Sequence, residues 1–318
     1  MIRFLLSRLL LPLVCLLAAP VAAAADARPV KAVEVVDRVY FVEGVTALGS
    51  PANRNFISNA GFVITSDGVV VVDALGSPAL AREMIAEIRR LTPLPIRHVI
   101  VTHYHADHIY GLQVFKAAGA NIIAHAGGKS YLNSQTARLR LEASRDELAP
   151  FIDAKTELLA ADQWLDKQET VLKVGDTALR ILHVGPAHTT EDLVVLVEGT
   201  GAMYAGDLVF RSRIPFVGQA DSRSWIGSLD RLIDLKPRIL IPGHGPVSTM
   251  PLEDLKLTRD YLVHLRKTMG DAAAELEPFD EAYDKADWTR FEHLPLFRAA
   301  NRMNAYNTYL LMEQQGRR

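Results

Sequence analysis

The sequence predicts an α+β protein in which two β-sheets pack together and carry helices on their outer faces. Two long stretches, residues 33–75 and 169–210, consist mainly of short apolar runs separated by turn residues, as is typical of strands. Segments with apolar residues at helical spacing lie between and after these stretches. The 318 residues, 49% of them hydrophobic, are enough to bury a large core. This organisation favours two sheets, although periodicity alone leaves a doubly wound parallel sheet possible.

The elements of the first half are expected in this order: strands at residues 33–45, a hairpin at 60–75, a helix at 77–92, a strand at 96–103, a helix at 107–119 and a strand at 120–125. Asp67 and Gly68 supply the turn of the hairpin. Pro78 fits the first turn of the helix. The strand at 96–103 is continuously apolar and therefore suits burial on both faces.

The second half is expected to hold a series of strands at residues 169–210, a helix at 222–235, a strand at 237–245 and helices from residue 251 onward. Trp225, Leu229 and Leu232 share one face of the helix. We therefore divide the chain into a main domain, residues 26–250, and a C-terminal helical extension, residues 251–318.

The first 25 residues have the pattern of a secretory signal peptide. Arg3 and Arg8 precede an apolar stretch that ends in small residues, and cleavage is expected near Ala25. The apolar stretch is short for a membrane span, so no stable membrane anchor is expected after cleavage. We expect a periplasmic or secreted protein. Cys15, the only cysteine, lies in this leader, which leaves the mature chain without a disulfide or a cysteine ligand.

A dense cluster of ligand-type side chains follows the strand at 96–103. His103, His105, Asp107 and His108 fall within six residues. Alternate side chains of an extended segment point the same way, so the first two histidines can bind one metal ion. The other two residues lie where the chain turns toward a helix and can reach a second ion. The cluster also ends a buried strand, where α/β proteins commonly place their sites.

One short loop cannot complete two coordination spheres, so further ligands are expected at other strand ends. His188, Asp207 and His244 each follow an apolar strand and adjoin a glycine or another small residue. The remaining histidines, including His125 and His183, lack such a setting and are expected to be structural.

The run His-Tyr-His-Ala-Asp-His resembles the H-x-H-x-D-H signature of the metallo-β-lactamase superfamily, and the resemblance extends over residues 33–250. It implies an αββα sandwich with two zinc ions at one edge of the sheets. By this resemblance, a first zinc is bound by His103, His105 and His188, a second by Asp107, His108 and His244, and Asp207 bridges them. Asp73 would orient a ligand.

The resemblance implies a hydrolase in which two zinc ions share a hydroxide that attacks an ester, thioester, lactone or lactam carbonyl. Asp207 and Asp107 are the candidate catalytic residues, Asp107 because it can also orient the hydroxide or take its proton. The absence of a cysteine ligand argues against the cysteine-containing lactamases. The His at position 105 argues against the flavodiiron proteins, which have Glu there.

Residues 207–232 and 301–315 also resemble the exported quinoprotein relay system zinc metallohydrolases, which are linked to sulfur oxidation. Two alternatives stay open: a mono-iron persulfide-type oxygenase, and a non-catalytic metal-containing binding or relay component of a periplasmic oxidation system.

A small molecule is the expected substrate. With a net charge of −2 and no basic stripe, nucleic acid is not an expected partner. No pattern predicts the oligomeric state.

Three further features are candidates for contact with the substrate. Residues 46–59 form a loop that can cover the site, and Arg211 and Arg213 can bind an anion. The last helix is expected to pack on the sandwich through an apolar face and to close one side of the cleft with neighbouring polar residues. The apolar residues are Met303, Tyr306, Leu310 and Leu311, and the polar ones Asn301, Asn304 and Tyr309.

Overall fold

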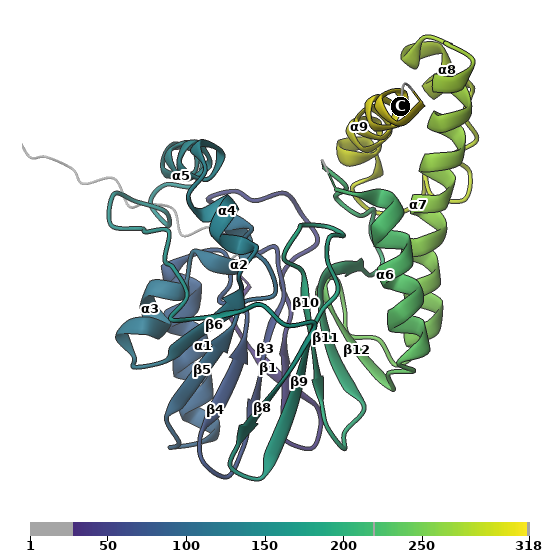
Figure 1. The fold of residues 1–318 in the computed structure, drawn as a ribbon. Coiled ribbons are helices and arrows are strands. Elements are labelled where there is room, and N and C mark those ends of the chain that lie inside the picture. The colour runs from purple at the N-terminus through teal and green to yellow at the C-terminus, as the bar shows by residue number, and fades with distance from the viewer. Residues whose placement is uncertain (1–27, 219, 317–318) are drawn as a thin grey trace, which may run out of the picture.

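Two β-sheets form the centre of the computed structural model, which describes residues 28–218 and 220–316 (Figure 1). The first sheet has the order β1 (Ala32–Val36), β2 (Val39–Val42), β3 (Ala60–Ile64), β4 (Val69–Val72), β5 (Ile96–Ile100), β6 (Asn121–His125) and β7 (Gln163–Leu165). The second has the order β12 (Ile239–His244), β11 (Ala202–Phe210), β10 (Leu193–Val197), β9 (Thr177–His183) and β8 (Glu169–Val174). The predicted leader and Cys15 lie outside the described residues.

Helices cover the outer face of each sheet and extend beyond the second one (Figure 1). On the first sheet lie α1 (Pro78–Leu91) and α3 (Leu112–Ala117), whereas α2 (Ala106–Ile109), α4 (Gly128–Leu132) and α5 (Gln135–Glu147) lie at the edge where its strands end (Figure 1). On the second lie α6 (Ser222–Asp234) and α7 (Pro251–Ala274), followed by α8 (Phe279–Lys285) and α9 (Phe297–Gly316). None of these helices is long and apolar enough to cross a membrane.

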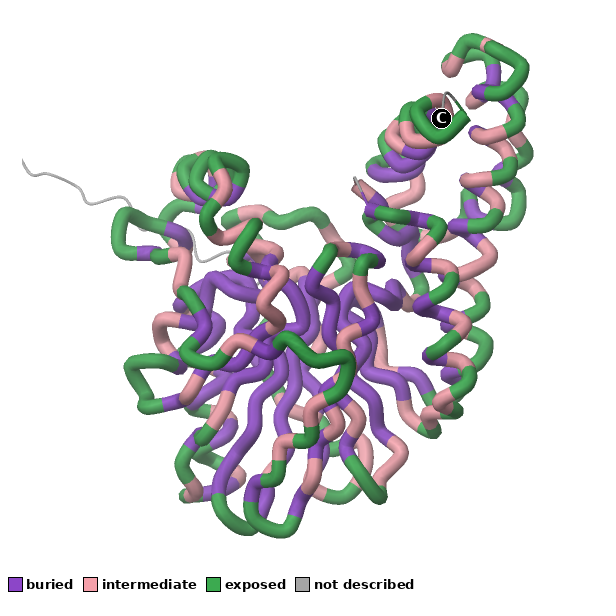
Figure 2. Tube along the Cα trace, viewed as in Figure 1, coloured by how far each residue is buried: buried purple, intermediate pink, exposed green. Residues whose placement is uncertain are grey.

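The core lies in three layers between these elements. Val72 and Ile100 of the first sheet pack against Ile181 and Val195 of the second, and each sheet has its own apolar cluster under its helices. Figure 2 shows the buried strands enclosed by helices whose outer faces are exposed. The predicted sandwich of two sheets between helices is confirmed, and the single doubly wound sheet is excluded for the described residues.

Local sequence signals account for several elements. Gly68 has φ of +151° in the β3–β4 hairpin, where Thr65 N–H donates to its carbonyl. Ser77 caps α1 by accepting from Leu80 N–H, and Pro78 follows it. The helix expected over residues 107–119 is instead two short helices. Gly111 lies at the break, where a Cβ atom would come within 2.0 Å of a backbone oxygen.

No sequence pattern predicted α4 and α5. Only Ala137, Leu141 and Ser144 of α5 are buried, so its apolar stripe is too narrow to stand out. Its start is defined by Ser134, which accepts from Ala137 N–H. These two helices matter for function because they border the cavity described below.

The prediction for the last helix is wrong in two respects. Met303, Tyr306 and Leu310 are 36–46% exposed, and α9 packs on α7 rather than on the sandwich. Its buried residues are Ala300, Asn301, Asn304, Ala305, Thr308 and Tyr309. Polar residues occupy this face because they hydrogen-bond across it: Asn304 Nδ2 donates to the Tyr261 hydroxyl of α7 over 2.9 Å.

Candidate metal centre

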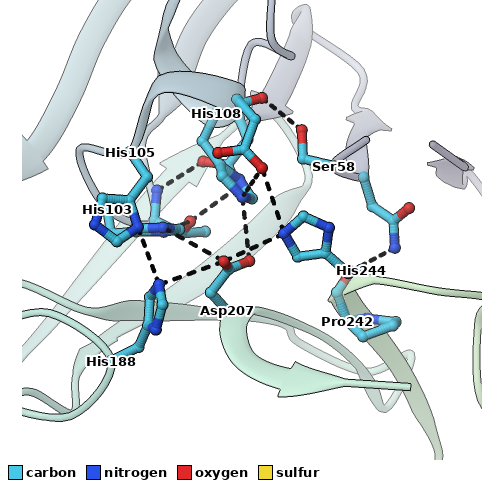
Figure 3. A network of polar contacts seen from close by, with 12 residues as sticks. Ser58, His103, His105, His108, His188, Asp207, Pro242 and His244 are labelled. Atoms are coloured by element: carbon cyan, nitrogen blue, oxygen red, sulfur yellow. Dashed lines mark hydrogen bonds and ion pairs between the residues drawn. The ribbon is translucent and has the colours of Figure 1, made fainter. Parts of the chain in front are cut away.

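The histidines and aspartates singled out in the sequence meet at one edge of the two sheets (Figure 3). His103 and His105 follow β5 and lead into α2, which carries Asp107 and His108. The contributions of the second sheet are His188 from the β9–β10 loop, Asp207 from β11 and His244 from the end of β12. Strand ends of both sheets therefore bring all seven side chains together.

The first group consists of His103, His105, His188 and Asp207, whose ligand atoms lie within 4.8 Å of one another. His105 Nδ1 is 3.0 Å from His188 Nε2. Asp207 Oδ2 is 3.4 Å from His188 Nε2 and 3.8 Å from His103 Nε2. Three imidazole nitrogens and one carboxylate oxygen at these separations suit a four-coordinate metal ion.

The second group consists of Asp107, His108 and His244. Asp107 Oδ2 lies 3.4 Å from His244 Nε2 and 3.7 Å from His108 Nε2. Asp207 reaches this group too, with Oδ1 3.1 Å from His108 Nε2 and Oδ2 3.3 Å from His244 Nε2. One carboxylate thus touches both groups, which is the position expected of a bridging ligand.

Asp73, at the end of β4, orients histidines of both groups. It accepts from Thr102 N–H and from the Thr102 hydroxyl, each over 2.8 Å, and lies 2.9 Å from His108 Nδ1. A carboxylate only accepts, so His108 Nδ1 must carry a hydrogen. The Thr102 oxygen is in turn 3.1 Å from His103 Nδ1 and accepts from it. In the neutral form, both histidines therefore present a bare Nε2 to the centre.

Buried atoms without hydrogen-bond partners indicate that the centre is built for a cation. Among the described residues, His103 Nε2, His108 Nε2 and Asp207 Oδ1 are buried without a hydrogen bond of normal geometry, although the last two atoms lie 3.1 Å apart. A buried polar atom left in this state costs about 1–3 kcal/mol. Burial lowers the pKa of His103, of His105 and, to about 3, of His188, so these imidazoles are neutral. Burial also disfavours charge on His108, but the nearby carboxylates outweigh it and raise that pKa.

Several supporting contacts carry no signal in the sequence. His244 Nδ1 donates to the Ile57 carbonyl over 2.7 Å, and the Phe210 ring stacks on the imidazole at 5.0 Å. Asn59 Nδ2 donates to the backbone oxygens on either side of His244. In the loop of His188, Asp192 accepts from the backbone and the hydroxyl of Thr189. Long-range pairing with backbone atoms sets these orientations, so residue type alone could not predict them.

A cavity of about 570 Å³ opens onto both groups. Its apolar lining residues are Ala47, Leu48, Ile57, Ala106, Leu148, Phe210 and Phe216. The first three belong to the loop at residues 46–59, so the prediction that this loop covers the site is supported by the structure. From α4 and α5 come Tyr131 and Arg140. The volume is in the usual range for a small-molecule site.

The two arginines predicted to bind an anion have different environments. Arg211 donates from Nε to Asp254 and from Nη1 to the Val247 carbonyl, each over 2.8 Å, so it fastens α7 to the sandwich. It does not line the cavity. Arg213 does line it, is only 5% exposed, and has no carboxylate within 4 Å among the described residues.

No residue of α9 lines this cavity, so the prediction that the last helix closes the cleft directly is wrong. Residues of α9 instead border a second cavity of about 310 Å³, together with Val217 and Gly218. The loop between β11 and α6 contributes lining residues to both cavities. His125 and His183, expected to be structural, stack on each other with ring centres 3.7 Å apart and belong to neither ligand group.

The sequence model of the metallo-beta-lactamase superfamily matches residues 53–244, a span that holds all seven site residues. A metallo-beta-lactamase type 2 of Bacillus sp. (strain 170) is 27% identical over 201 residues, which cover 61% of this chain and 70% of that protein. A linear primary-alkylsulfatase of Pseudomonas sp. (strain ATCC 19151) is 25% identical over 235 residues, covering 63% of this chain but only 44% of that protein.

One solved structure matches beyond the sandwich. The stereoselective inverting sec-alkylsulfatase of Pseudomonas sp. superimposes on 89% of this chain and 50% of its own length, with a TM-score of 0.72 and 16% identity. The chain therefore spans about half the length of the alkylsulfatases that it matches. The family model, the fold and the His/Asp centre agree, and the named relatives are metallohydrolases. This chain belongs to the metallo-beta-lactamase superfamily.

Proposed function

We propose that this protein is an exported dinuclear zinc hydrolase that cleaves an ester, thioester, lactone or lactam bond. The observation that carries the proposal is Asp207, a single buried carboxylate that lies against histidines of both ligand groups. The described residues contain no thiolate, and imidazole with carboxylate is a donor set that suits zinc.

The first zinc would be held by His103, His105 and His188, the second by Asp107, His108 and His244, with Asp207 shared between them. When bound, such a pair of ions lowers the pKa of water and polarises the oxygen of the scissile group. No serine or cysteine nucleophile is then needed.

The side chains of the protein would position the reactants and handle the proton. Asp107 lines the cavity, its side chain is 16% exposed, and its Oδ2 lies between the two histidines of its group. It is therefore placed to hold an attacking water and to accept its proton. Asp73 and Thr102 keep the histidine tautomers fixed during this step.

Sulfate esters are a second candidate substrate class. The alkylsulfatase match covers 89% of this chain, including helices that the lactamase core does not need, and a buried arginine lines the cavity. Both bond types place negative charge on an oxygen in the transition state, which bound cations stabilise.

The test is a hydrolysis panel of esters, thioesters, lactones, lactams and alkyl sulfates, run with elemental analysis of protein purified without added metal. Two zinc ions per chain with turnover of a panel member support the proposal. One iron per chain with oxygen uptake on a persulfide would establish the oxygenase instead. Tight binding of a quinone cofactor or a partner protein without turnover would establish the relay component.

Single ligand variants should separate the two ions. We expect His188→Ala to lose the first ion, because this imidazole touches only that group, and His244→Ala to weaken the second selectively. Metal affinity at the affected position should fall by about 100-fold or more. Removal of a direct ligand should lower the affinity at least as much as removal of a residue that hydrogen-bonds to a ligand. Elemental analysis after dialysis measures this, with His264→Ala, which belongs to neither group, as the control. Full occupancy in both ligand variants contradicts the assignment.

Export is part of the proposal and rests on the leader. We expect the mature protein to begin near residue 26 and to accumulate outside the cytoplasm. Intact-mass measurement of protein from the periplasmic or culture fraction tests this expectation. Purified protein that still carries Met1, or that stays in the cytoplasm, would rule it out without affecting the metal assignment.

A further inference from the structure

Arg213 is a buried cation that forms no ion pair within 4 Å among the described residues, although the charges of Asp207 and Asp107 act on it from farther away. Its Nε donates to the Ile214 carbonyl over a long 3.4 Å. Its Nη1 lies 3.2 Å from His244 Nδ1, but that nitrogen already donates to Ile57 and cannot accept. The guanidinium is therefore left with most of its donors unused. A buried charge in this state is costly unless something else pairs with it.

The surroundings hold the guanidinium in place at the cavity wall. Its central carbon lies 5.4 Å from the centre of the Phe210 ring, which restricts its orientation. Phe210 also stacks on His244, so the charge lies next to the second ligand group. Arg140, the other arginine of the cavity, already pairs with Glu147 over 3.0 Å. Of the two, Arg213 is the one with donors free for a ligand.

Apolar side chains face the same cavity from two loops. Leu48 is 60% exposed and Phe216 is 39% exposed, although both line the cavity beside the metal centre. Large apolar side chains that stay exposed at a concave site are typical of ligand contacts. The cavity thus combines one buried positive charge with a partly open apolar wall.

We infer that Arg213 binds an anionic group of the substrate, and that the substrates are organic anions with an apolar chain or ring. The anion is a carboxylate or a sulfate, either of which a guanidinium binds through two parallel hydrogen bonds. The apolar part lies against Leu48 and Phe216. This inference rests on the proposed hydrolase site and narrows its substrate class.

Binding can be measured without turnover. Zinc-loaded protein is titrated by calorimetry with octanoate, n-octyl sulfate and neutral 1-octanol. We expect wild type to bind at least one anion about 10- to 100-fold more tightly than the alcohol. Arg213→Gln should abolish that preference, with both zinc ions retained and the affinity for octanol unchanged. Arg213→Lys should keep part of the preference for anions, because the positive charge remains but the planar guanidinium that makes two parallel hydrogen bonds is lost.

Arg140→Gln is the matched control, since it removes the same kind of charge from the same cavity, and it should change anion binding by less than about 3-fold. Equal affinity for octanol and both anions in wild type overturns the inference. A larger loss in Arg140→Gln than in Arg213→Gln overturns it as well. A preference for octanoate or for octyl sulfate identifies which anion the site takes.

Failure of the inference differs from failure of the proposed function. Hydrolysis is compared for 4-nitrophenyl hexanoate and the monoanion mono-4-nitrophenyl adipate. If both esters are cleaved equally well and anions bind no more tightly than octanol, the proposed hydrolase activity is supported and the anion-binding role of Arg213 is contradicted. If no compound in the panel is cleaved but octyl sulfate binding depends on Arg213, the anion site is supported and the proposed hydrolase activity is contradicted.

Discussion

Replacing Asp207 with alanine is expected to remove both metal ions and to lower kcat/KM for any hydrolysed substrate by about 1,000-fold or more. One of its oxygens lies 3.1 Å from His108 Nε2, and the other lies 3.3 Å from His244 Nε2 and 3.4 Å from His188 Nε2. The ion-pair contacts between the two groups' ligand atoms, from His108 and from His244, both end on Asp207. Elemental analysis of dialysed protein and steady-state kinetics measure the two effects.

Asp230→Ala is the control for this variant. Its carboxylate lies in α6 and pairs with Arg259 over 2.6 Å, away from both ligand groups. This variant should keep two ions and full activity. Circular dichroism of both variants shows whether the Asp207 protein is still folded, and Asp207→Asn, with nearly the same shape, serves as a second test. Loss of only one ion from the Asp207 variants would mean that the carboxylate does not bridge.

The sequence was most informative about the candidate metal site, because histidines and aspartates are concentrated close to the ends of apolar runs. His103, His105, Asp107 and His108 occupy one short turn, so their meeting is a local property that spacing reveals. The other three ligand candidates were recognisable because each follows an apolar run in the sequence, and the ends of strands in packed sheets converge. The hairpin at Gly68 and the helix capped by Ser77 were equally local, and both appear as predicted.

Contacts between distant segments were not predictable in this way. Arg211 and Arg213 are the same residue type two positions apart, yet one pairs with Asp254 and the other faces the cavity. The partner is supplied by α7, more than forty residues later in the chain. Only the packing of that helix decides which arginine is left free.

The last helix shows why an apolar pattern can mislead. Met303 and Tyr306 have the helical spacing of a buried face, but they are 41% and 46% exposed. The buried side of α9 carries Asn301 and Asn304, which are fully enclosed and hydrogen-bonded. A buried polar network can replace apolar packing when every member has a partner. Those partners lie on other elements, so the pattern of α9 alone did not reveal them.

Asn304 links the last helix to the loop that carries Arg213. Its Oδ1 accepts from Val217 N–H over 3.0 Å, and its Nδ2 donates to the Pro215 carbonyl over 2.8 Å and to the Tyr261 hydroxyl over 2.9 Å. The C-terminal helix therefore acts on the metal cavity indirectly, by fixing the backbone just after Arg213. This connection replaces the predicted direct contact between helix and cleft.

Asn304→Ala is expected to lower the free energy of unfolding by about 2–4 kcal/mol. It leaves the Val217 N–H and the Pro215 carbonyl without their partner and removes one of the two hydrogen bonds of the Tyr261 hydroxyl. Metal content should stay at the wild-type level, since no ligand candidate lies on α9 or on this loop. Octyl sulfate binding by the zinc-loaded protein should weaken, because Arg213 is no longer held at the cavity. Urea unfolding, elemental analysis and calorimetry measure these three quantities.

Met303→Ala is the matched control, because it truncates the neighbouring residue on the exposed side of the same helix and should change stability by less than about 0.5 kcal/mol. A point substitution is sharper than removal of the whole helix, which would also uncover Leu265 and Met269 on the buried face of α7. If Asn304→Ala loses stability but binds octyl sulfate as tightly as wild type, the helix is a structural cap and the loop keeps Arg213 in place by itself. If it also loses metal, the cavity and the metal centre depend on one another more closely than the separate contacts of this loop imply.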